Sequence, residues 1–138
     1  MSKIAVVFWS GSGNTEAMAN AVAQGAGDGA QIIQVSDFGA DQVAEYDAIA
    51  FGCPAMGDEV LEESEFEPVF EACKPALSGK KIALFGSYGW GDGAWMRNWE
   101  QDCKDCGAIL ACDSVICNDA PDDAVNDALK ALGSALAN

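Results

Sequence analysis

Histidine is absent from this chain of 138 residues, and basic side chains are scarce, with seven Lys and Arg against 22 Asp and Glu. No Lys or Arg occurs between Lys3 and Lys74, and the net charge is −15. Nucleic acids and anionic membranes bind to basic surfaces, so this charge argues against both as partners. It suggests either a partner protein with a basic docking patch or simply a well-solvated surface.

Long apolar runs are also missing. Every apolar run has the length of a strand, far short of the roughly 20 residues that a membrane-spanning helix needs. The first predicted strand begins near Lys3, which leaves no room for a signal peptide. We therefore expect a cytoplasmic location, in which the six cysteines are reduced thiols.

One cysteine pair, Cys103-x-x-Cys106, has the spacing of a redox or metal motif. Catalytic pairs of this kind lie at helix N-termini, where the dipole lowers the thiol pKa, whereas this pair precedes Gly107 at the predicted end of a helix. A zinc site would need two further ligands, and the chain has no histidine and no second such pair. We expect neither a metal site nor a redox role for these thiols.

Apolar segments of strand length alternate with segments of helical periodicity along the chain. We expect strands over 3–9, 31–36, 47–53, 81–86 and 108–117, and helices over 14–24, 65–76, 94–106 and 122–136. The segment 37–46 is predicted to be a connection with a short helical turn. Strands that are apolar on both faces and alternate with helices form a parallel sheet covered on both sides. The sequence thus predicts one α/β domain over residues 1–138.

The segment Phe8–Thr15, FWSGSGNT, joins the first strand to the first helix. Its glycines let the backbone approach a ligand closely, its N–H groups can point inward, and the dipole of the following helix favours negative charge. In the loop 10–15 the side chains able to donate hydrogen bonds are hydroxyls and an amide. We expect this loop to bind a phosphate group with neutral donors.

Other phosphate sites of similar appearance do not fit this loop. A P-loop requires GxxxxGK[ST], and no lysine is present. A dinucleotide-binding turn requires GxGxxG, and Glu16 stands where the third glycine would fall. A receiver domain would need an acidic cluster at the end of the first strand, where Trp9-Ser10-Gly11 supplies none.

Two more loops should meet the first one, because ligands of open α/β sheets bind beyond the carboxyl ends of the strands. Met56 follows the third strand, and Tyr88 and Trp90 follow the fourth, each beside glycine. Met56 and Trp90 are suited to stack on the two faces of a planar ligand. Glu59 can accept a hydrogen bond from an N–H edge of such a ligand. The neighbouring carboxylates are expected to form a solvated acidic face: Glu62, Glu63 and Glu65.

Three segments, SGSGNTEAMA, AMGDEVLEES and LFGSYGWGDGAWM, resemble those of flavodoxins, especially the short-chain type of anaerobic bacteria. The resemblance covers nearly the whole chain. It implies a flavodoxin-like three-layer sandwich whose five-stranded parallel sheet has the order 2-1-3-4-5, with a fifth strand that runs straight through. It further implies non-covalently bound FMN and a low-potential one-electron carrier that replaces ferredoxin between redox enzymes, as a monomer.

The resemblance also implies the residues that bind FMN. The loop 10–15 would hold the phosphate, Met56 and Trp90 would cover the inner and outer faces of the isoalloxazine, and Glu59 would accept the ring N3–H. Asn118 would touch the ribityl chain or the ring edge. The full set is Ser10, Gly11, Ser12, Gly13, Asn14, Thr15, Pro54, Ala55, Met56, Gly57, Asp58, Glu59, Ser87, Tyr88, Gly89, Trp90, Gly91 and Asn118. Pro54 departs from relatives that carry Ser there, because it has neither a hydroxyl nor an N–H group.

No catalytic residue is expected, but the Gly57–Asp58 peptide is a candidate redox switch. Reduction by one electron places a proton on flavin N5, and a peptide that turns its carbonyl toward this proton would stabilise it. Glycine at position 57 allows the positive φ that such a turn needs. Two alternatives stay open: an FMN-dependent NAD(P)H–quinone reductase of the same fold, and a redox-inert FMN or phosphate-binding module.

Overall fold

The computed structural model of the chain describes residues 3–11, 13–56, 60–89 and 91–137. Its parallel sheet has the order β2-β1-β3-β4-β5, with β6 also paired to β4, which confirms the predicted order. The strands are β1 (Ile4–Phe8), β2 (Ala30–Gln34), β3 (Ala48–Gly52), β4 (Lys81–Tyr88), β5 (Ile109–Leu110) and β6 (Val115–Asn118). The α-helices are α1 (Asn14–Ala26), α2 (Phe66–Cys73), α3 (Ala94–Asp105) and α4 (Asp123–Ala137), and the 3₁₀ helices are η1 (Val35–Asp37), η2 (Ala40–Glu45) and η3 (Lys74–Ala76).

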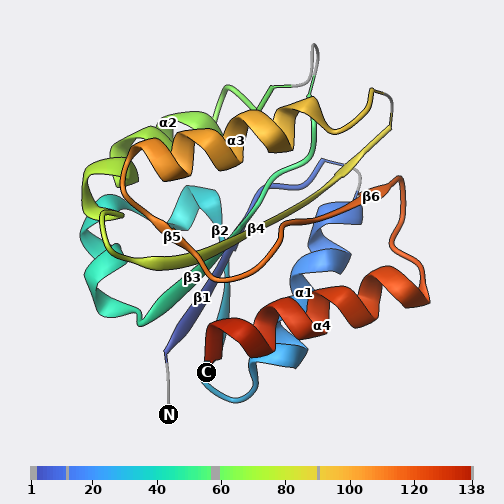
Figure 1. Ribbon diagram of the computed structural model, residues 1–138, viewed down its shortest axis with the longest axis horizontal. Helices are drawn as coiled ribbons and strands as arrows, with labels where there is room; N and C mark the ends of the chain where they lie inside the picture. Colours follow the sequence, from blue (N-terminus) through green and yellow to red (C-terminus); the bar gives the residue numbers. More distant parts are fainter. Residues whose placement is uncertain (1–2, 12, 57–59, 90, 138) are drawn as a thin grey trace.

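Helices cover both faces of the sheet, with α2 and α3 on one side and α1 and α4 on the other (Figure 1). Each central strand serves both layers because successive side chains point to opposite faces. In β1, Ala5 and Val7 belong to the core under α2 and α3, whereas Ile4, Val6 and Phe8 belong to the core under α1 and α4. All five side chains are buried, as expected for a parallel sheet. No helix in the described part of the chain has the length and apolar character needed to cross a membrane.

An aromatic cluster fixes α2 and α3 over the sheet. The ring of Phe51 on β3 meets that of Phe70 edge-on, with centroids 5.2 Å apart. Phe66 and Trp99 meet in the same way at 5.4 Å. Such pairs contribute about 1 kcal/mol each beyond their buried area. The cluster therefore holds the N-terminus of α2 close to the carboxyl end of β3.

On the other face, α1 and α4 cross at two glycines. A Cβ atom at Gly25 would lie 1.9 Å from the carbonyl oxygen of Lys130, and one at Gly133 would lie 2.1 Å from that of Val22. Because this contact needs Gly25 inside the helix, α1 continues past the predicted end at residue 24. It stops at Gly27, whose φ is 89°.

Three strand predictions are wrong in their bounds by two residues or more. The strand expected over 31–36 ends at Gln34, and Val35–Asp37 forms η1. β4 extends to Tyr88, so that Ser87 and Tyr88 are strand residues rather than loop residues. The strand expected over 108–117 is divided: Ile82 pairs with Leu110 and Phe85 with Val115, so the four residues 111–114 lie opposite only two residues of β4. This bulge divides the segment into β5 and β6. The helix expected over 65–76 is α2 followed by η3.

Candidate functional site

A cavity of about 350 Å³ lies beyond the carboxyl ends of β1, β3 and β4. It is lined by residues that follow these three strands and by one that follows β6: Trp9, Gly11, Asn14, Pro54, Ala55, Met56, Ser87, Tyr88, Gly89 and Asp119. The structure thus brings the three predicted loops together at one edge of the sheet. None of these lining residues is a Lys or Arg, in agreement with a site of neutral donors.

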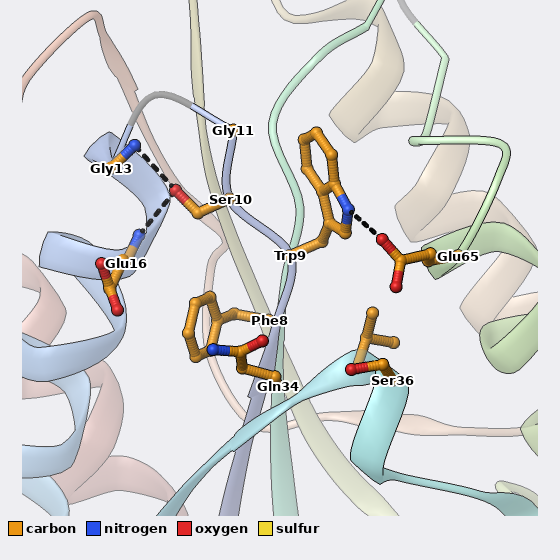
Figure 2. Close-up of a pocket in the computed structure, with 10 residues that line it drawn as sticks. Phe8, Trp9, Ser10, Gly11, Gly13, Glu16, Gln34, Ser36 and Glu65 are labelled. Atoms are coloured by element: carbon orange, nitrogen blue, oxygen red, sulfur yellow. Dashed lines mark hydrogen bonds between the residues drawn. The ribbon is translucent and has the colours of Figure 1, made fainter.

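The N–H groups of the first loop converge at a single point. The hydroxyl of Ser10 accepts hydrogen bonds from the backbone N–H of Gly13 at 3.0 Å and of Glu16 at 3.3 Å (Figure 2). Gly13 has a φ of 96°, which turns its N–H inward before α1 begins. Donors arranged in this way at a helix N-terminus can hold an anionic oxygen.

A second cavity, of about 430 Å³, also borders this loop (Figure 2). Trp9 lines both cavities, and in the second its indole N–H donates to Glu65 at 3.2 Å. The second cavity extends toward the β2 side, where Gln34 and Ser36 line it. Although it is the larger of the two, its lining contains Glu65 but not Pro54, Ala55 or Met56, and no residue of the loop after β4, so we assign the ligand to the first cavity.

The first turn of α1 is tied to the end of β4. Thr15 is 1% exposed and Ser87 is 5% exposed, and their hydroxyls lie 3.2 Å apart. The Thr15 hydroxyl therefore faces Ser87 and is absent from the cavity lining, whereas Asn14 is part of that lining. This contact aligns the phosphate loop with the loop after β4.

The loop after β3 begins with fixed backbone contacts. The N–H of Ala55 donates to the carbonyl of Ser87 at 3.0 Å. Met56 and Val60 exchange two backbone hydrogen bonds of 2.9 and 3.0 Å, which close a narrow hairpin. Five of the predicted site residues lie outside the described residues: Ser12, Gly57, Asp58, Glu59 and Trp90.

Glu62 corrects the expectation of a solvated acidic face. Its side chain is buried, with the residue 5% exposed, and its carboxylate accepts hydrogen bonds from the N–H groups of Ser64, Glu65 and Phe66 and from the Ser64 hydroxyl. The carboxylate satisfies the free N–H groups at the start of α2, and this compensates for its burial. Glu63 and Glu65 are exposed, as predicted.

Comparison with known proteins assigns the family. The flavodoxin family model matches residues 6–131 of this chain. The flavodoxins of Clostridium beijerinckii and Megasphaera elsdenii are both 47% identical to it, over 96% and 97% of this chain and 98% of each relative. The solution structure of the two-electron reduced Megasphaera elsdenii flavodoxin superposes with a TM-score of 0.89 over 97% of this chain and 98% of that one.

The chain belongs to the flavodoxin family. Flavodoxins bind FMN and carry single electrons at low potential, and this flavodoxin shares that cofactor and that function. The alternative of an NAD(P)H–quinone reductase is not favoured by these relatives.

The residues present suit FMN. The phosphate would face converging N–H donors and no cation, and a planar ring would face the apolar side chains of Met56, Tyr88 and Trp9. A Cβ atom at Gly11 would lie 3.1 Å from the Trp9 ring, so the loop backbone and this ring are in close contact. The donor set thus fits the phosphate, and the cavity walls fit the ring.

Two lining residues of this flavodoxin were missed by sequence reasoning, Trp9 and Asp119. Trp9 closes the first apolar run and was assigned to the strand, but β1 ends one residue earlier. Asp119 follows β6, has a φ of 60°, and donates its N–H to the Tyr88 carbonyl at 2.8 Å. The position of Asp119 directly after a strand at this edge of the sheet is the signal that could have identified it.

Other predicted residues lie near the cavity without lining it. The amide of Asn118 donates to the Tyr88 carbonyl at 3.3 Å. Ser10 and Gly13 line the second cavity and present the converging N–H groups. Gly91 has a φ of 91° in the loop after β4.

The cysteines of this flavodoxin are free thiols. Burial raises the pKa of Cys103 to about 12, and the Cys106 thiol donates to the Cys103 carbonyl at 3.2 Å near the end of α3. A thiol with a raised pKa stays protonated and unreactive at neutral pH. Within the residues that the structure describes, no group of His, Cys, Asp or Glu side chains could hold a metal ion.

Proposed function

We propose that the 350 Å³ cavity is the FMN site and that the chain acts as a diffusible carrier without substrate turnover of its own. The observation that carries this proposal is the single cavity lined by residues from the loops after β1, β3 and β4. FMN, when bound, supplies one-electron chemistry, whereas the chain binds it, orients it and sets its surroundings. We further propose that residues 1–138 act as one FMN-binding domain.

The phosphate is proposed to bind the loop 10–15. Its N–H groups already converge at the Ser10 hydroxyl, which supports this role. Because the Thr15 hydroxyl faces Ser87, we assign Thr15 a contribution through its backbone N–H. Ser12 and Asn14 would complete the set of neutral donors, and Pro54 would add no hydrogen-bond donor.

The ring is proposed to lie between the loops after β3 and β4. Met56, which lines the cavity, would contact the inner face, and Trp90 would contact the outer face. Glu59 would accept the ring N3–H. The remaining proposed contacts come from Ala55, Ser87, Tyr88, Gly89, Gly91 and Asn118.

The Gly57–Asp58 peptide is proposed to present its carbonyl to the proton on flavin N5. The reciprocal hydrogen bonds between Met56 and Val60 support this role, because they fix both ends of the segment while glycine permits positive φ. A peptide held at both ends can rotate without displacing the rest of the loop.

An anaerobic redox titration of the FMN-loaded protein, followed by absorption, tests the carrier and the switch together. We expect two separate one-electron steps and no steady oxidation of added NADH. In Gly57→Thr the two midpoint potentials should approach each other, because a β-branched residue resists positive φ. Val60→Thr places the same side chain beside the hairpin end and serves as the control. Steady NADH oxidation would overturn the carrier proposal, and an unchanged separation in Gly57→Thr would overturn the switch.

We propose that the redox partners are ferredoxin-type donors and acceptors with basic docking patches, and that the chain works as a monomer. The charge of −15 and the stretch without Lys or Arg between Lys3 and Lys74, which contains much of the cavity lining, support an acidic docking face. The cytoplasm remains the proposed compartment, supported by six free thiols.

A further inference from the structure

The loop that carries Met56 returns to the core at Glu62, whose carboxylate accepts four hydrogen bonds. Its Oε1 atom accepts the N–H groups of Glu65 and Phe66, each at 2.8 Å, and its Oε2 atom accepts the N–H of Ser64 at 2.9 Å. The Ser64 hydroxyl donates to Oε2 as well. Every partner is a donor, so both oxygens of an ionised carboxylate are needed.

The same residue is tied to the end of β3. The backbone N–H of Glu62 donates to the Cys53 sulfur at 3.3 Å, and the Cys53 thiol donates to the Pro54 carbonyl at 3.5 Å. Cys53 is fully buried in the core. Residues 54–61 therefore leave the core at Cys53 and return to it at Glu62, with these two residues in contact.

Between Cys53 and Glu62, the described residues of the loop make further backbone hydrogen bonds. Met56 and Val60 exchange two hydrogen bonds, and Ala55 donates to Ser87 on β4. Val60 is 39% exposed, whereas the partly buried Leu61 packs against the core under α2 and α3. The polar attachment of this returning arm to α2 is made by Glu62.

We propose that the Glu62 carboxylate is a positioning residue that holds the loop 54–61, and with it Met56, at the FMN cavity. This inference rests on the proposed FMN site. Glu62 acts through the N-terminus of α2, which the aromatic cluster of Phe51, Phe66, Phe70 and Trp99 fixes on the sheet. Its role is to transmit the position of a rigid helix to the loop that carries Met56.

Three substitutions separate this role from a simple effect of charge. Glu62→Gln removes the charge and replaces one acceptor oxygen with a donor NH₂, which the backbone N–H groups of residues 64–66 cannot accept. Glu62→Asp keeps the charge but shortens the side chain by one methylene, which withdraws it from the N–H groups of α2. Glu63→Gln removes the same charge from the adjacent exposed position and is the matched control.

Two measurements on the full chain report on the loop. The dissociation constant for FMN is measured by flavin fluorescence, and amide hydrogen exchange at Met56 and Val60 is measured without FMN. We expect Glu62→Gln and Glu62→Asp each to weaken FMN binding about tenfold and to speed exchange at both amides about tenfold. Glu63→Gln should leave both within about twofold of the wild type. Should the Glu62 variants fail to fold, Ser64→Ala, which removes one donor, should shift both readouts in the same direction by a smaller factor.

Two results would overturn the positioning role. Equal effects of Glu62→Gln and Glu63→Gln, with Glu62→Asp unchanged, would show that charge alone acts. Faster exchange limited to residues 64–66, with Met56, Val60 and the FMN affinity unchanged, would make Glu62 a helix cap only. A wild-type chain that does not bind FMN would instead overturn the proposed site. The hydrogen-exchange measurements at Met56 and Val60 would still decide the role of Glu62.

Discussion

At the scale of single residues, the molecule uses buried polar groups where the chain must turn sharply beside the cofactor cavity. Glu62 and Thr15 are both nearly inaccessible; Glu62 joins the loop after β3 to α2, and Thr15 joins α1 to β4. A buried polar group is tolerated when its hydrogen bonds are satisfied, and both meet this condition. These two contacts fix the cavity walls more firmly than apolar packing alone would, because a hydrogen bond has direction.

The ionisation of Glu62 should be visible in the acid stability of the protein. Burial by itself raises the pKa of Glu62, but the hydrogen bonds from Ser64, Phe66 and Glu65 outweigh it and hold the pKa below its usual value of 4.5. A lowered folded-state pKa contributes stability that is present above pH 4.5 and is lost as the pH falls through the lower, folded-state value. We expect Glu62→Gln to reduce the free energy of unfolding by about 2 kcal/mol at pH 7 and by much less at pH 3.

Urea unfolding of the wild type and Glu62→Gln from pH 3 to pH 7 checks this prediction. Glu63→Gln, which loses an exposed carboxylate, serves as the control and should show a small difference at every pH. A difference between wild type and Glu62→Gln that stays constant from pH 7 to pH 3 would contradict the assignment.

At the scale of secondary-structure elements, the helices on the two faces of the sheet support different loops of the cavity. α2 and α3 rest on aromatic rings and support the loop after β3, whereas α1 and α4 cross through glycines and support the phosphate loop. The helix crossing is close because Gly25 and Gly133 have no side chains. The direction of the α1 axis depends on that crossing. The position of the α1 N-terminus beside the phosphate loop therefore depends on it as well.

The crossing can be tested with Gly133→Ala. In an exposed helix this change would stabilise the fold by about 1 kcal/mol, since alanine is the better helix former. Here the new Cβ would lie 2.1 Å from the Val22 carbonyl oxygen and 2.7 Å from the Ala26 nitrogen, and backbone atoms cannot move aside cheaply. We expect a net loss of about 2 kcal/mol, seen as a lower melting temperature.

Ala131→Ser, at an exposed position of the same helix, adds one heavy atom without a clash and is the control. A melting temperature of Gly133→Ala at or above that of the wild type would show that the two helices move apart without cost, contrary to this account.

At the scale of the whole molecule, negative charge dominates. The chain carries 22 Asp and Glu against seven Lys and Arg, and Lys74 is held by Glu71 and Asp102 on the α2–α3 side, away from the cavity. The first cavity is lined by Asp119 and by no cation. An added electron at this site therefore meets repulsion from the carboxylates of the protein, and none of the residues that line the cavity is a cation that would offset it. One charge at about 10 Å with an effective dielectric constant of about 40 costs roughly 0.8 kcal/mol.

This repulsion should depend on salt. The screening length is about 30 Å at 0.01 M and about 3 Å at 1 M, so distant carboxylates act at low ionic strength and cease to act at high ionic strength. We expect the second midpoint potential to become less negative by tens of millivolts, about 35 mV for each such carboxylate screened, between these conditions. Potentiometric titration at several NaCl concentrations checks this. A potential that does not change, or becomes more negative, would show that distant charges have no role.

Much of the fold could be predicted because its signals are local. Apolar runs of strand length, helical periodicity and the glycine-rich junction 10–15 act over a few residues, so the parallel α/β class and the phosphate loop follow from them. The strand order came from the resemblance to flavodoxins, and the structure confirms it. The bounds were less accurate where contacts between elements decide them. α1 continues through Gly25 because α4 needs close approach there, and the fifth strand divides because its pairing with β4 slips by two residues.

The sequence by itself determined the layers of this flavodoxin, the three loops that meet at the sheet edge and the neutral character of the phosphate site. Only the tertiary structure decided that Glu62 is buried, that Thr15 faces Ser87, and that Trp9 and Asp119 line the cavity. The physical reason is distance along the chain. Periodicity specifies which face of an element is apolar, but a contact between Thr15 and Ser87 exists only after the chain has folded back on itself.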